Sequence, residues 1–307
     1  LLLSQRGHQV EFEDNFSTGI RSNIDILKLK YYEFDIADTY QLKELLCSKK
    51  FDVILHFAGS AYITESFEKP GNYYQNNVIN GLKLLETVRG IKPLPKIIFS
   101  SSCATYGIPS KCPISEDCAQ IPISPYGRSK LIVEWMLLDY HKRYKQPYTI
   151  LRYFNAAGCH PDGILGEQHD PEPHLIPRMI MAALKNQSIQ IYGKKYNTPD
   201  GTCIRDYIHI WDLAMAHVLA AENIKCRANI FNLGLGIGFS ILEIVKSLEN
   251  LLGYSLSIEW GPPRLGDPPE LFADSTKALK LLNWHPEFSS IEQILLTSLQ
   301  WFEKNLV

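Results

Sequence analysis

Short apolar runs alternate with longer stretches of helical periodicity along the first two-thirds of the chain. Apolar positions recurring every three to four residues predict helices at 40–47, 73–88 and 127–144. Strands that alternate with helices imply right-handed crossovers and a parallel sheet covered on both faces. The predicted fold class is therefore α/β, with a doubly wound parallel sheet. The apolar runs predict strands at 10–13, 31–34, 53–57, 97–100 and 149–153.

Polar or small residues follow each predicted strand. In open α/β sheets, ligands bind beyond the carboxyl ends of the strands. The sequence therefore predicts a ligand site at that edge of the sheet. The residues concerned are Asp14, Asp35, Ala58 with Gly59, Ser102 and Asn155.

The character of the chain changes after Gly158, where prolines and glycines become frequent and regular segments become shorter. We interpret this as a sheet domain over residues 1–160 followed by a smaller α/β substrate-binding domain over 161–307. A further apolar segment near 230–245 is expected to return to the sheet.

Composition narrows the range of functions. The 307 residues are 45% hydrophobic and 21% charged, with a formal net charge of −2. This balance argues against a nucleic-acid-binding surface, and no apolar run approaches the length of a membrane span. The seven cysteines include no Cys-x-x-Cys pair, so we expect neither a disulfide framework nor a metal site. A reducing cytoplasm is the expected location.

Tyr126 and Lys130 carry the strongest chemical signal. They stand four residues apart at the start of a predicted helix and therefore share one face. An ammonium close to a phenol favours the phenolate, which is then able to accept a proton. Ser102, at the end of a predicted strand, is placed to hydrogen-bond the same substrate oxygen. This set suits removal of a proton from an alcohol while a hydride leaves the same carbon.

Tyrosine and lysine at this spacing also occur by chance on amphipathic helices, with the lysine in solvent. Here the pair lies in Ser124-Pro125-Tyr126-Gly127-Arg128-Ser129-Lys130, shortly after a strand that ends in Ser100-Ser101-Ser102. That context favours the catalytic interpretation over coincidence.

A dinucleotide-binding unit also needs a first strand and a glycine-rich turn whose backbone N–H groups hold the pyrophosphate. The opening residues, 1–8, resemble instead the end of the helix that follows such a turn, with Gly7 as its stop. We expect about 20 residues of strand, turn and half helix to complete the unit. The glycines at 234, 236 and 238 lie too late in the chain to replace them.

The chain resembles the UDP-galactose (UDP-glucose) 4-epimerases of the extended short-chain dehydrogenase/reductase superfamily, nearly from end to end. The segment from Asp200 to His209 is the part most specific to nucleotide-sugar 4-epimerases. The resemblance implies a Rossmann-like sheet and a homodimer. The motifs that carry it are Asp14-Asn15, Asp35-Ile36, His56-Phe57-Ala58-Gly59, residues 73–78, Phe99-Ser100-Ser101-Ser102, residues 126–130, residues 151–155, His174-Leu175-Ile176-Pro177, residues 200–209 and Arg264-Leu265-Gly266-Asp267.

The resemblance implies NAD as the cofactor. Asp14 would accept hydrogen bonds from the adenosine ribose, and a carboxylate there disfavours the 2′-phosphate of NADP. Lys130 would bind the nicotinamide ribose, and Asn76 would fix the nicotinamide side. The other implied cofactor residues are Asn15, Asp35, Ile36, Phe57, Ala58, Gly59, Ser100, Tyr126, Tyr153 and Phe154.

The implied substrate is a UDP-hexose. Arg205 and Arg264 would bind the diphosphate because guanidinium makes bidentate, permanently charged contacts. Asp267 would hold the uridine ribose, and Tyr192 would pack on uracil. The remaining implied substrate residues are Ser102, Tyr126, Asn155, His174, Leu175 and Tyr207.

The implied reaction is reversible epimerisation at C4 through a 4-keto intermediate. One alternative is a 4,6-dehydratase, which needs acids directly after the serine; here Cys103-Ala104 follow Ser102. Another is a truncated, non-catalytic chain that binds a nucleotide sugar. Glu11 and Glu13 remain without an interpretation in a strand expected to be apolar on both faces.

Overall fold

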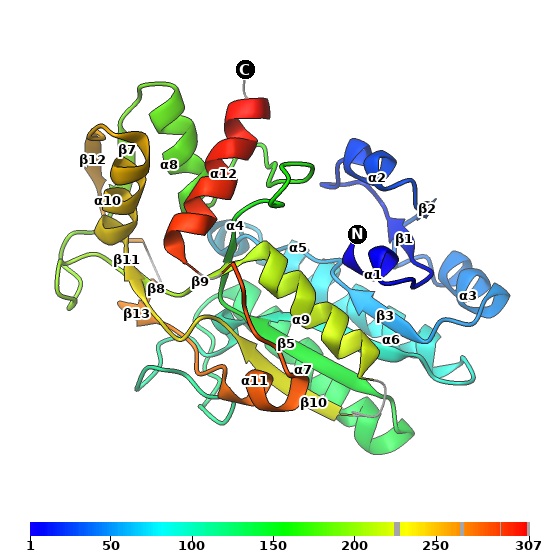
Figure 1. Ribbon diagram of the computed structural model, residues 1–307. Helices are drawn as coiled ribbons and strands as arrows, with labels where there is room; N and C mark the ends of the chain where they lie inside the picture. The colour runs from blue at the N-terminus through cyan, green and yellow to red at the C-terminus, as the bar shows by residue number, and fades with distance from the viewer. Residues whose placement is uncertain (224–227, 265–266, 289, 306–307) are drawn as a thin grey trace. The chain divides into compact units, whose positions relative to one another are not determined.

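The computed structural model describes residues 1–223, 228–264, 267–288 and 290–305 (Figure 1). The chain crosses several times between two compact units, whereas the sequence interpretation placed a boundary at residue 160 and a return to the sheet near 230–245. Unit 1 consists of Leu1–Thr105, Pro122–Arg152 and His217–Phe231, and unit 2 of Tyr106–Ile121, Tyr153–Ala216 and Asn232–Val307.

The strands of unit 1 form a parallel pair, β1–β2, and a four-stranded sheet of order β10-β5-β4-β3. The β3–β4 pairing is also parallel. The predicted α/β class with parallel strands is confirmed, and each of the five predicted strands matches an observed one to within two residues at either end. The strands are β1 (Glu11–Asp14), β2 (Lys30–Glu33), β3 (Val53–His56), β4 (Lys96–Ser102), β5 (Tyr148–Tyr153) and β10 (Ala228–Leu233), the last two ending in residues of unit 2.

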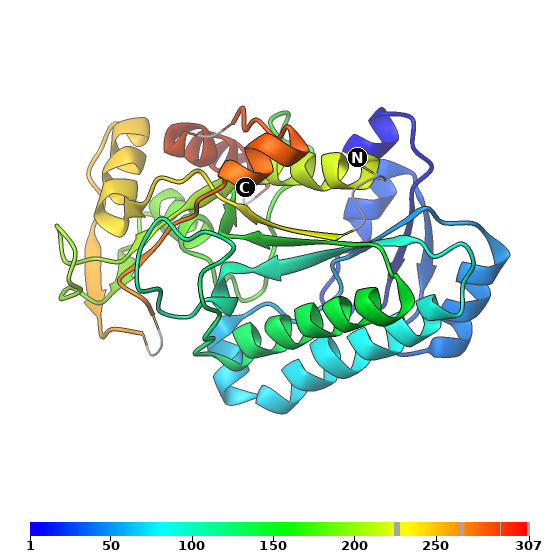
Figure 2. The same ribbon diagram turned by 90° about the horizontal axis from the view of Figure 1, so that it is seen from below.

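The helices of unit 1 cover the four-stranded sheet. Figure 2 shows α6 (cyan) and α7 (green) side by side along one face, and Leu84, Val88, Val133 and Leu137 of these helices share a core with Phe99 of β4. The helices are α1 (Leu2–Gln5), α2 (Arg21–Leu27), α3 (Thr39–Ser48), α4 (Ile63–Glu68), α5 (Pro70–Tyr73), α6 (Asn80–Arg89) and α7 (Pro125–Tyr144).

The helix predicted at 73–88 is not uniform. A π-helical segment, η1 (Tyr74–Ile79), joins α5 to α6. Within it Asn77 is buried, and its side chain bonds to Ser60 and Ser129. Hydrophobic periodicity does not reveal such a widened turn, because it spans only six residues within a longer helical pattern.

Unit 2 contains short strand pairs and longer helices. The parallel pairs are β6–β9 and β7–β12, and β8 lies between β11 and β13. A second core joins Ile180 of α8, Leu248 of α10 and Leu295 of α12. The strands are β6 (Asn155–Ala157), β7 (Ile189–Tyr192), β8 (Ile204–Arg205), β9 (Tyr207–His209), β11 (Phe239–Ser240), β12 (Ile258–Gly261) and β13 (Glu270–Leu271); the helices are α8 (Leu175–Leu184), α9 (Ile210–Glu222, shared with unit 1), α10 (Ile241–Leu252), α11 (Thr276–Leu282) and α12 (Ile291–Asn305).

None of the helices in the described ranges has both the length and the apolar character that crossing a bilayer requires.

Candidate functional site

The start of α7 packs closely against the turn that follows β4. Ser124 caps the helix by accepting a hydrogen bond from the N–H of Gly127 at 3.0 Å, and Pro125 occupies the first helical position. A Cβ on Gly127 would overlap the carbonyl oxygen of Ala104. Glycine therefore lets the helix that carries Tyr126 approach the 3₁₀ turn η2 (Cys103–Thr105), directly after Ser102.

Lys130 is a buried cation next to Tyr126. Its side chain is 6% exposed, and its Nζ donates to the carbonyl oxygen of Ser100 at 3.0 Å. The same Nζ lies 5.9 Å from the centroid of the Tyr126 ring. Burial lowers the pKa of Lys130 to about 8. Within the described residues no carboxylate forms an ion pair with it, so the ammonium remains available to a bound group.

Tyr126 is 8% exposed and meets a second tyrosine, Tyr73, edge to face, with ring centroids 6.4 Å apart. The Tyr73 hydroxyl donates to the carbonyl oxygen of Tyr62 and accepts from its N–H. This fixes the Tyr73 ring, which in turn restricts the position of the Tyr126 ring.

A buried ion pair lies one helical turn beyond Lys130. Glu134 accepts hydrogen bonds from the guanidinium of Arg152 (2.7 and 3.0 Å) and from the hydroxyl of Ser101, and both charged side chains are almost fully buried. The pair ties α7 to β4 and β5. Tyr126, Lys130 and Glu134 follow one another at intervals of four. This spacing is visible in the sequence and places Glu134 on the same helix face as the other two.

Small residues and amides follow β3. A Cβ on Gly59 would lie 3.0 Å from Oδ1 of Asn77 and 3.5 Å from Nζ of Lys130. The Nδ2 of Asn76 donates to Ser60 Oγ at 3.1 Å. The structure therefore brings Gly59 and Lys130 together, while Asn77, which the sequence analysis did not assign, makes the buried contacts.

The ends of β1 and β2 also converge. Asn15 donates to Asp35 at 2.8 Å, and Asp14 accepts from the backbone N–H of Phe16 at 2.7 Å. Ile36 is buried, whereas Phe57, after β3, is 54% exposed and Ala58 is also exposed.

The two unexplained glutamates of β1 have different surroundings. Glu11 accepts from the hydroxyl of Tyr32 at 3.0 Å and pairs with Lys49, so it lies on a polar edge of the strand. Burial, with the nearby carboxylates of Asp14 and Asp35, raises the pKa of Glu13 to about 8. The expectation that β1 is apolar on both faces is wrong, because all four of its residues are only half-buried.

In unit 2, Arg205 is not a free cation. Its guanidinium pairs with the carboxylate of Asp267 and donates to the carbonyl oxygens of Pro268 (2.6 Å) and Ile204 (2.7 Å). Arg205 is 9% exposed. In this structure the two residues assigned to diphosphate and ribose therefore neutralise each other.

Arg264 is exposed, and its guanidinium carbon lies 4.4 Å from the ring centroid of Tyr192. Leu265 and Gly266 of the same motif lie outside the described residues. Tyr207 is buried, which raises its pKa.

The remaining predicted residues of unit 2 lie at the ends of its elements. Asn155 in β6 donates through its side chain to the carbonyl oxygen of Asp206 at 2.9 Å. Tyr153 is half-buried, and Phe154 is buried, with its N–H bonded to Leu233. Leu175 opens α8.

His174 precedes α8 and contacts two carboxylates, those of Glu167 and Glu172. Desolvation acts to lower the pKa of His174, but these carboxylates outweigh it and raise the pKa to about 9. Its side chain nevertheless keeps 46% of its surface exposed, so water screens these pairs.

The buried Asp206, between Arg205 and Tyr207, was not predicted as a functional residue. Its carboxylate accepts from the N–H groups of Leu235 (2.7 Å), Gly236 and Ala273 (both 3.0 Å). Burial still raises its pKa to about 6. A Cβ at Gly234 would overlap this carboxylate. Asp206 therefore joins three segments of unit 2. Its place in the 200–209 motif is explained by this structural role.

Comparisons with known proteins agree with this geometry. The model of the NAD dependent epimerase/dehydratase family matches residues 2–234. The UDP-glucose 4-epimerase of Lactobacillus helveticus is 40% identical over 306 residues, covering 99% of this chain and 92% of the relative. The Brucella ovis UDP-glucose 4-epimerase, solved in complex with NAD, is 48% identical with a TM-score of 0.92, covering 98% of this chain and 93% of that chain.

The Bifidobacterium longum UDP-glucose 4-epimerase, solved with NAD+ and UDP, is 35% identical with a TM-score of 0.94, covering 99% of this chain and 94% of that chain. The resemblance inferred from the motifs is thus confirmed over almost the whole sequence. The chain belongs to the NAD dependent epimerase/dehydratase family and, within it, to the UDP-glucose 4-epimerases.

Proposed function

We propose that this protein interconverts UDP-galactose and UDP-glucose by NAD-dependent epimerisation at C4 of the hexose. The observation that carries the proposal is the buried ammonium of Lys130, 5.9 Å from the Tyr126 ring and without a described carboxylate partner. Burying a cation without a counter-charge costs free energy, so such a cation indicates a site for a bound ligand or a reaction.

The residues of unit 1 fit NAD. Asp14, at the end of β1, offers a carboxylate to ribose hydroxyls. A side chain at Gly59 would crowd Asn77 and Lys130, so glycine there lets Lys130 lie close to the backbone that follows β3. Two protons of the Lys130 ammonium remain for a second ribose, because the described bond to Ser100 uses one.

The chain's own residues handle the proton of the reaction. The phenolate of Tyr126 takes the proton of the sugar 4-hydroxyl and later returns it. Ser102 hydrogen-bonds the same oxygen, and Lys130 stabilises the negative phenolate. NAD, when bound, supplies the hydride acceptor and donor at C4. The 4-keto sugar is reduced on its other face after it turns.

We assign the UDP moiety to residues of unit 2. Arg264 is exposed and always charged, which suits a diphosphate, and Tyr192 offers an aromatic face. Asn155, His174, Leu175 and Tyr207 complete the proposed set, and Arg205 and Asp267 support it through the ion pair that they form with each other. Binding energy from UDP is then remote from the reacting carbon, which leaves the sugar free to rotate.

The 4,6-dehydratase alternative is disfavoured by the turn after Ser102. A dehydratase needs acids there, and η2 begins with Cys103 and Ala104. Neither side chain is a carboxylic acid, the group that the dehydratase assignment requires there.

The decisive experiment replaces Tyr126 by Phe in the NAD-loaded protein. We expect kcat for UDP-galactose to fall by about 10²–10⁴-fold, the usual contribution of a general base, while the Kd for UDP is unchanged. Tyr140→Phe, at a half-buried tyrosine on the same helix whose hydroxyl bonds Glu86, is the control and keeps full activity. Near-normal turnover of Tyr126→Phe would contradict the assignment of Tyr126 as the general base.

We further propose a homodimer in a reducing cytoplasm. Apolar side chains stay exposed on α7 and η1, among them Trp135 (55%), Leu138 (39%) and Ile79 (45%), and such a patch favours self-association. The described cysteines carry free thiols. Sedimentation equilibrium tests the dimer: the native protein should sediment at twice the chain mass and Trp135→Glu at the chain mass, whereas a native monomer would exclude it.

A further inference from the structure

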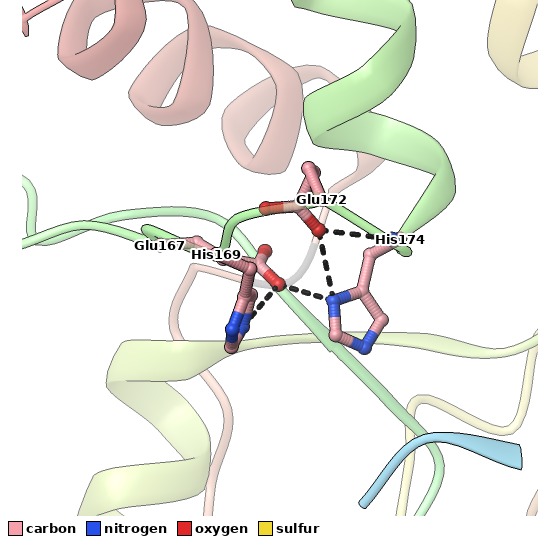
Figure 3. A group of neighbouring side chains, drawn as sticks. All are labelled: Glu167, His169, Glu172 and His174. Carbon is pink, nitrogen blue, oxygen red and sulfur yellow. Dashed lines mark hydrogen bonds and ion pairs between the residues drawn. The ribbon is translucent and has the colours of Figure 1, made fainter. Parts of the chain in front are cut away.

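Two glutamates and two histidines gather in the segment before α8 (Figure 3). Glu167, His169, Glu172 and His174 each offer one ligand atom, and these atoms all lie within 4.8 Å of one another. They occur in the sequence as Glu-x-His, two residues, and Glu-x-His again. The cluster belongs to unit 2, whereas Tyr126 and Lys130 belong to unit 1.

The carboxylates are held inside the cluster and the imidazoles lie nearer to solvent. Glu167 and Glu172 are 18% and 5% exposed, against 32% and 46% for His169 and His174. His174 Nδ1 lies 2.5 Å from Glu167 Oε1 and 3.1 Å from Glu172 Oε1. His169 Nε2 lies 3.3 Å from the same Glu167 oxygen. All these atoms point to one small volume.

These separations are close to those of a four-coordinate metal. Zinc bonds of about 2.0–2.2 Å to nitrogen and oxygen place ligand atoms roughly 3.3–3.6 Å apart in a tetrahedron. Two imidazoles with two carboxylates form a borderline donor set that suits Zn²⁺ and Co²⁺, not Ca²⁺ or Mg²⁺.

The surrounding backbone limits how far the cluster has to move. Pro171 and Pro173 flank Glu172 and fix two of its neighbouring φ angles. The backbone N–H of His174 donates to Glu172 Oε1 at 2.9 Å, which holds this carboxylate against the start of α8. Small side-chain rotations therefore suffice to open the cluster for an ion.

We propose that Glu167, His169, Glu172 and His174 form a structural binding site for one zinc ion. The metal would take the place of the direct contacts between His174 and the two carboxylates and would fasten this loop to α8. All four ligands come from one segment of unit 2, and His174 is the one that the proposed UDP-binding set shares.

The test is titration of the metal-stripped, NAD-loaded protein with Zn²⁺ by calorimetry. We expect one ion per chain and a rise of the unfolding temperature with zinc concentration. His169→Gln should weaken zinc binding by at least about tenfold while leaving the metal-free unfolding temperature and epimerase activity unchanged. The matched control is His8→Gln, since His8 also contacts one glutamate, Glu222, at 3.0 Å with similar exposure (44%); its zinc affinity should equal that of the native protein.

Co²⁺ provides a second, spectroscopic measurement. The intense visible bands of four-coordinate cobalt should appear at one equivalent and vanish in His169→Gln. Absence of one-to-one binding, or binding that His169→Gln leaves intact, would overturn the proposal. So would a thiolate-to-cobalt charge-transfer band, because it would place the metal at a cysteine such as the exposed Cys47.

Discussion

Two buried cations, Lys130 in unit 1 and Arg205 in unit 2, differ in what balances their charge. Lys130 meets a neutral carbonyl, and burial lowers its pKa to about 8. Arg205 is similarly buried, but it faces the carboxylate of Asp267 and two carbonyl oxygens. Arg205 is thus satisfied by the fold, whereas Lys130 carries an unbalanced charge that stability alone does not explain. This difference supports the proposal that Lys130 serves the reaction.

The largest expected effect is the loss of turnover in Lys130→Met. Removing the ammonium takes away the charge that favours the Tyr126 phenolate, so we expect kcat to fall by about 10²–10³-fold. Steady-state assays with UDP-galactose measure this. Lys142→Met, at the exposed end of the same helix, serves as the control and keeps native kcat. Retention of activity in Lys130→Met would remove the contrast between the two cations.

The second effect concerns Asp267→Asn. This change leaves the buried guanidinium of Arg205 without its counter-charge, so we expect a loss of about 3 kcal/mol in the free energy of unfolding. The value is at the low end for buried pairs because 26% of the Asp267 side chain is exposed. Thermal unfolding of the variant measures it.

The matched control for that change is Glu33→Gln, which breaks the exposed pair with Arg21 and should leave the unfolding temperature unchanged. Equal unfolding temperatures for Asp267→Asn and the native protein would show that Arg205 does not rely on Asp267.

The sequence was sufficient to predict the parts of the fold that depend on local pattern. The strands β3, β4 and β5 contain apolar runs, and the Tyr126–Lys130 spacing follows from the helical period alone. In unit 2, β8, β11 and β13 contain two residues each. Such strands form only by pairing with distant segments, so no local periodicity predicts them.

The contacts of charged side chains were harder to predict, since they depend on chain segments far apart. Arg205 and Asp267 are separated by 62 positions, and the sequence analysis assigned both to a ligand because it had no measure of their proximity. The His–Glu cluster was missed for another reason. Its spacing is local and visible, but the search for metal sites was based on cysteine pairs.

The third effect is a gain of stability in the same Lys130→Met variant. The folded-state pKa of about 8 lies below the ordinary 10.5, so the charged amine costs stability at every pH below 8. The unfolded chain holds more protons than the folded one between these values, and native stability rises with pH across that window. We expect the variant to be more stable than the native protein by about 3 kcal/mol at pH 7.

That advantage should shrink as the pH rises above 8. Chemical denaturation at several pH values between neutral and about 9.5 measures it. A variant less stable than the native protein at pH 7 would mean that the bond from Lys130 to the Ser100 carbonyl outweighs the cost of burial. A pH-independent difference would mean that the amine is not desolvated.

The smallest effect separates the two arginines of unit 2. Arg264 is exposed and stacks on Tyr192, and no described carboxylate pairs with it, so it is the arginine ready to meet a diphosphate. We expect Arg264→Ala to raise the Kd for UDP about tenfold, or 1.4 kcal/mol, with an unchanged unfolding temperature. The Kd of Arg264→Lys, which keeps the charge but loses the planar stacking group, should fall between those of the native protein and Arg264→Ala.

If Asp267→Asn weakens UDP binding more than Arg264→Ala does, the Arg205–Asp267 pair opens to bind the nucleotide, and the structural role given to Arg205 is wrong. If only Arg264→Ala weakens it, Arg205 acts through the fold and Arg264 through the ligand.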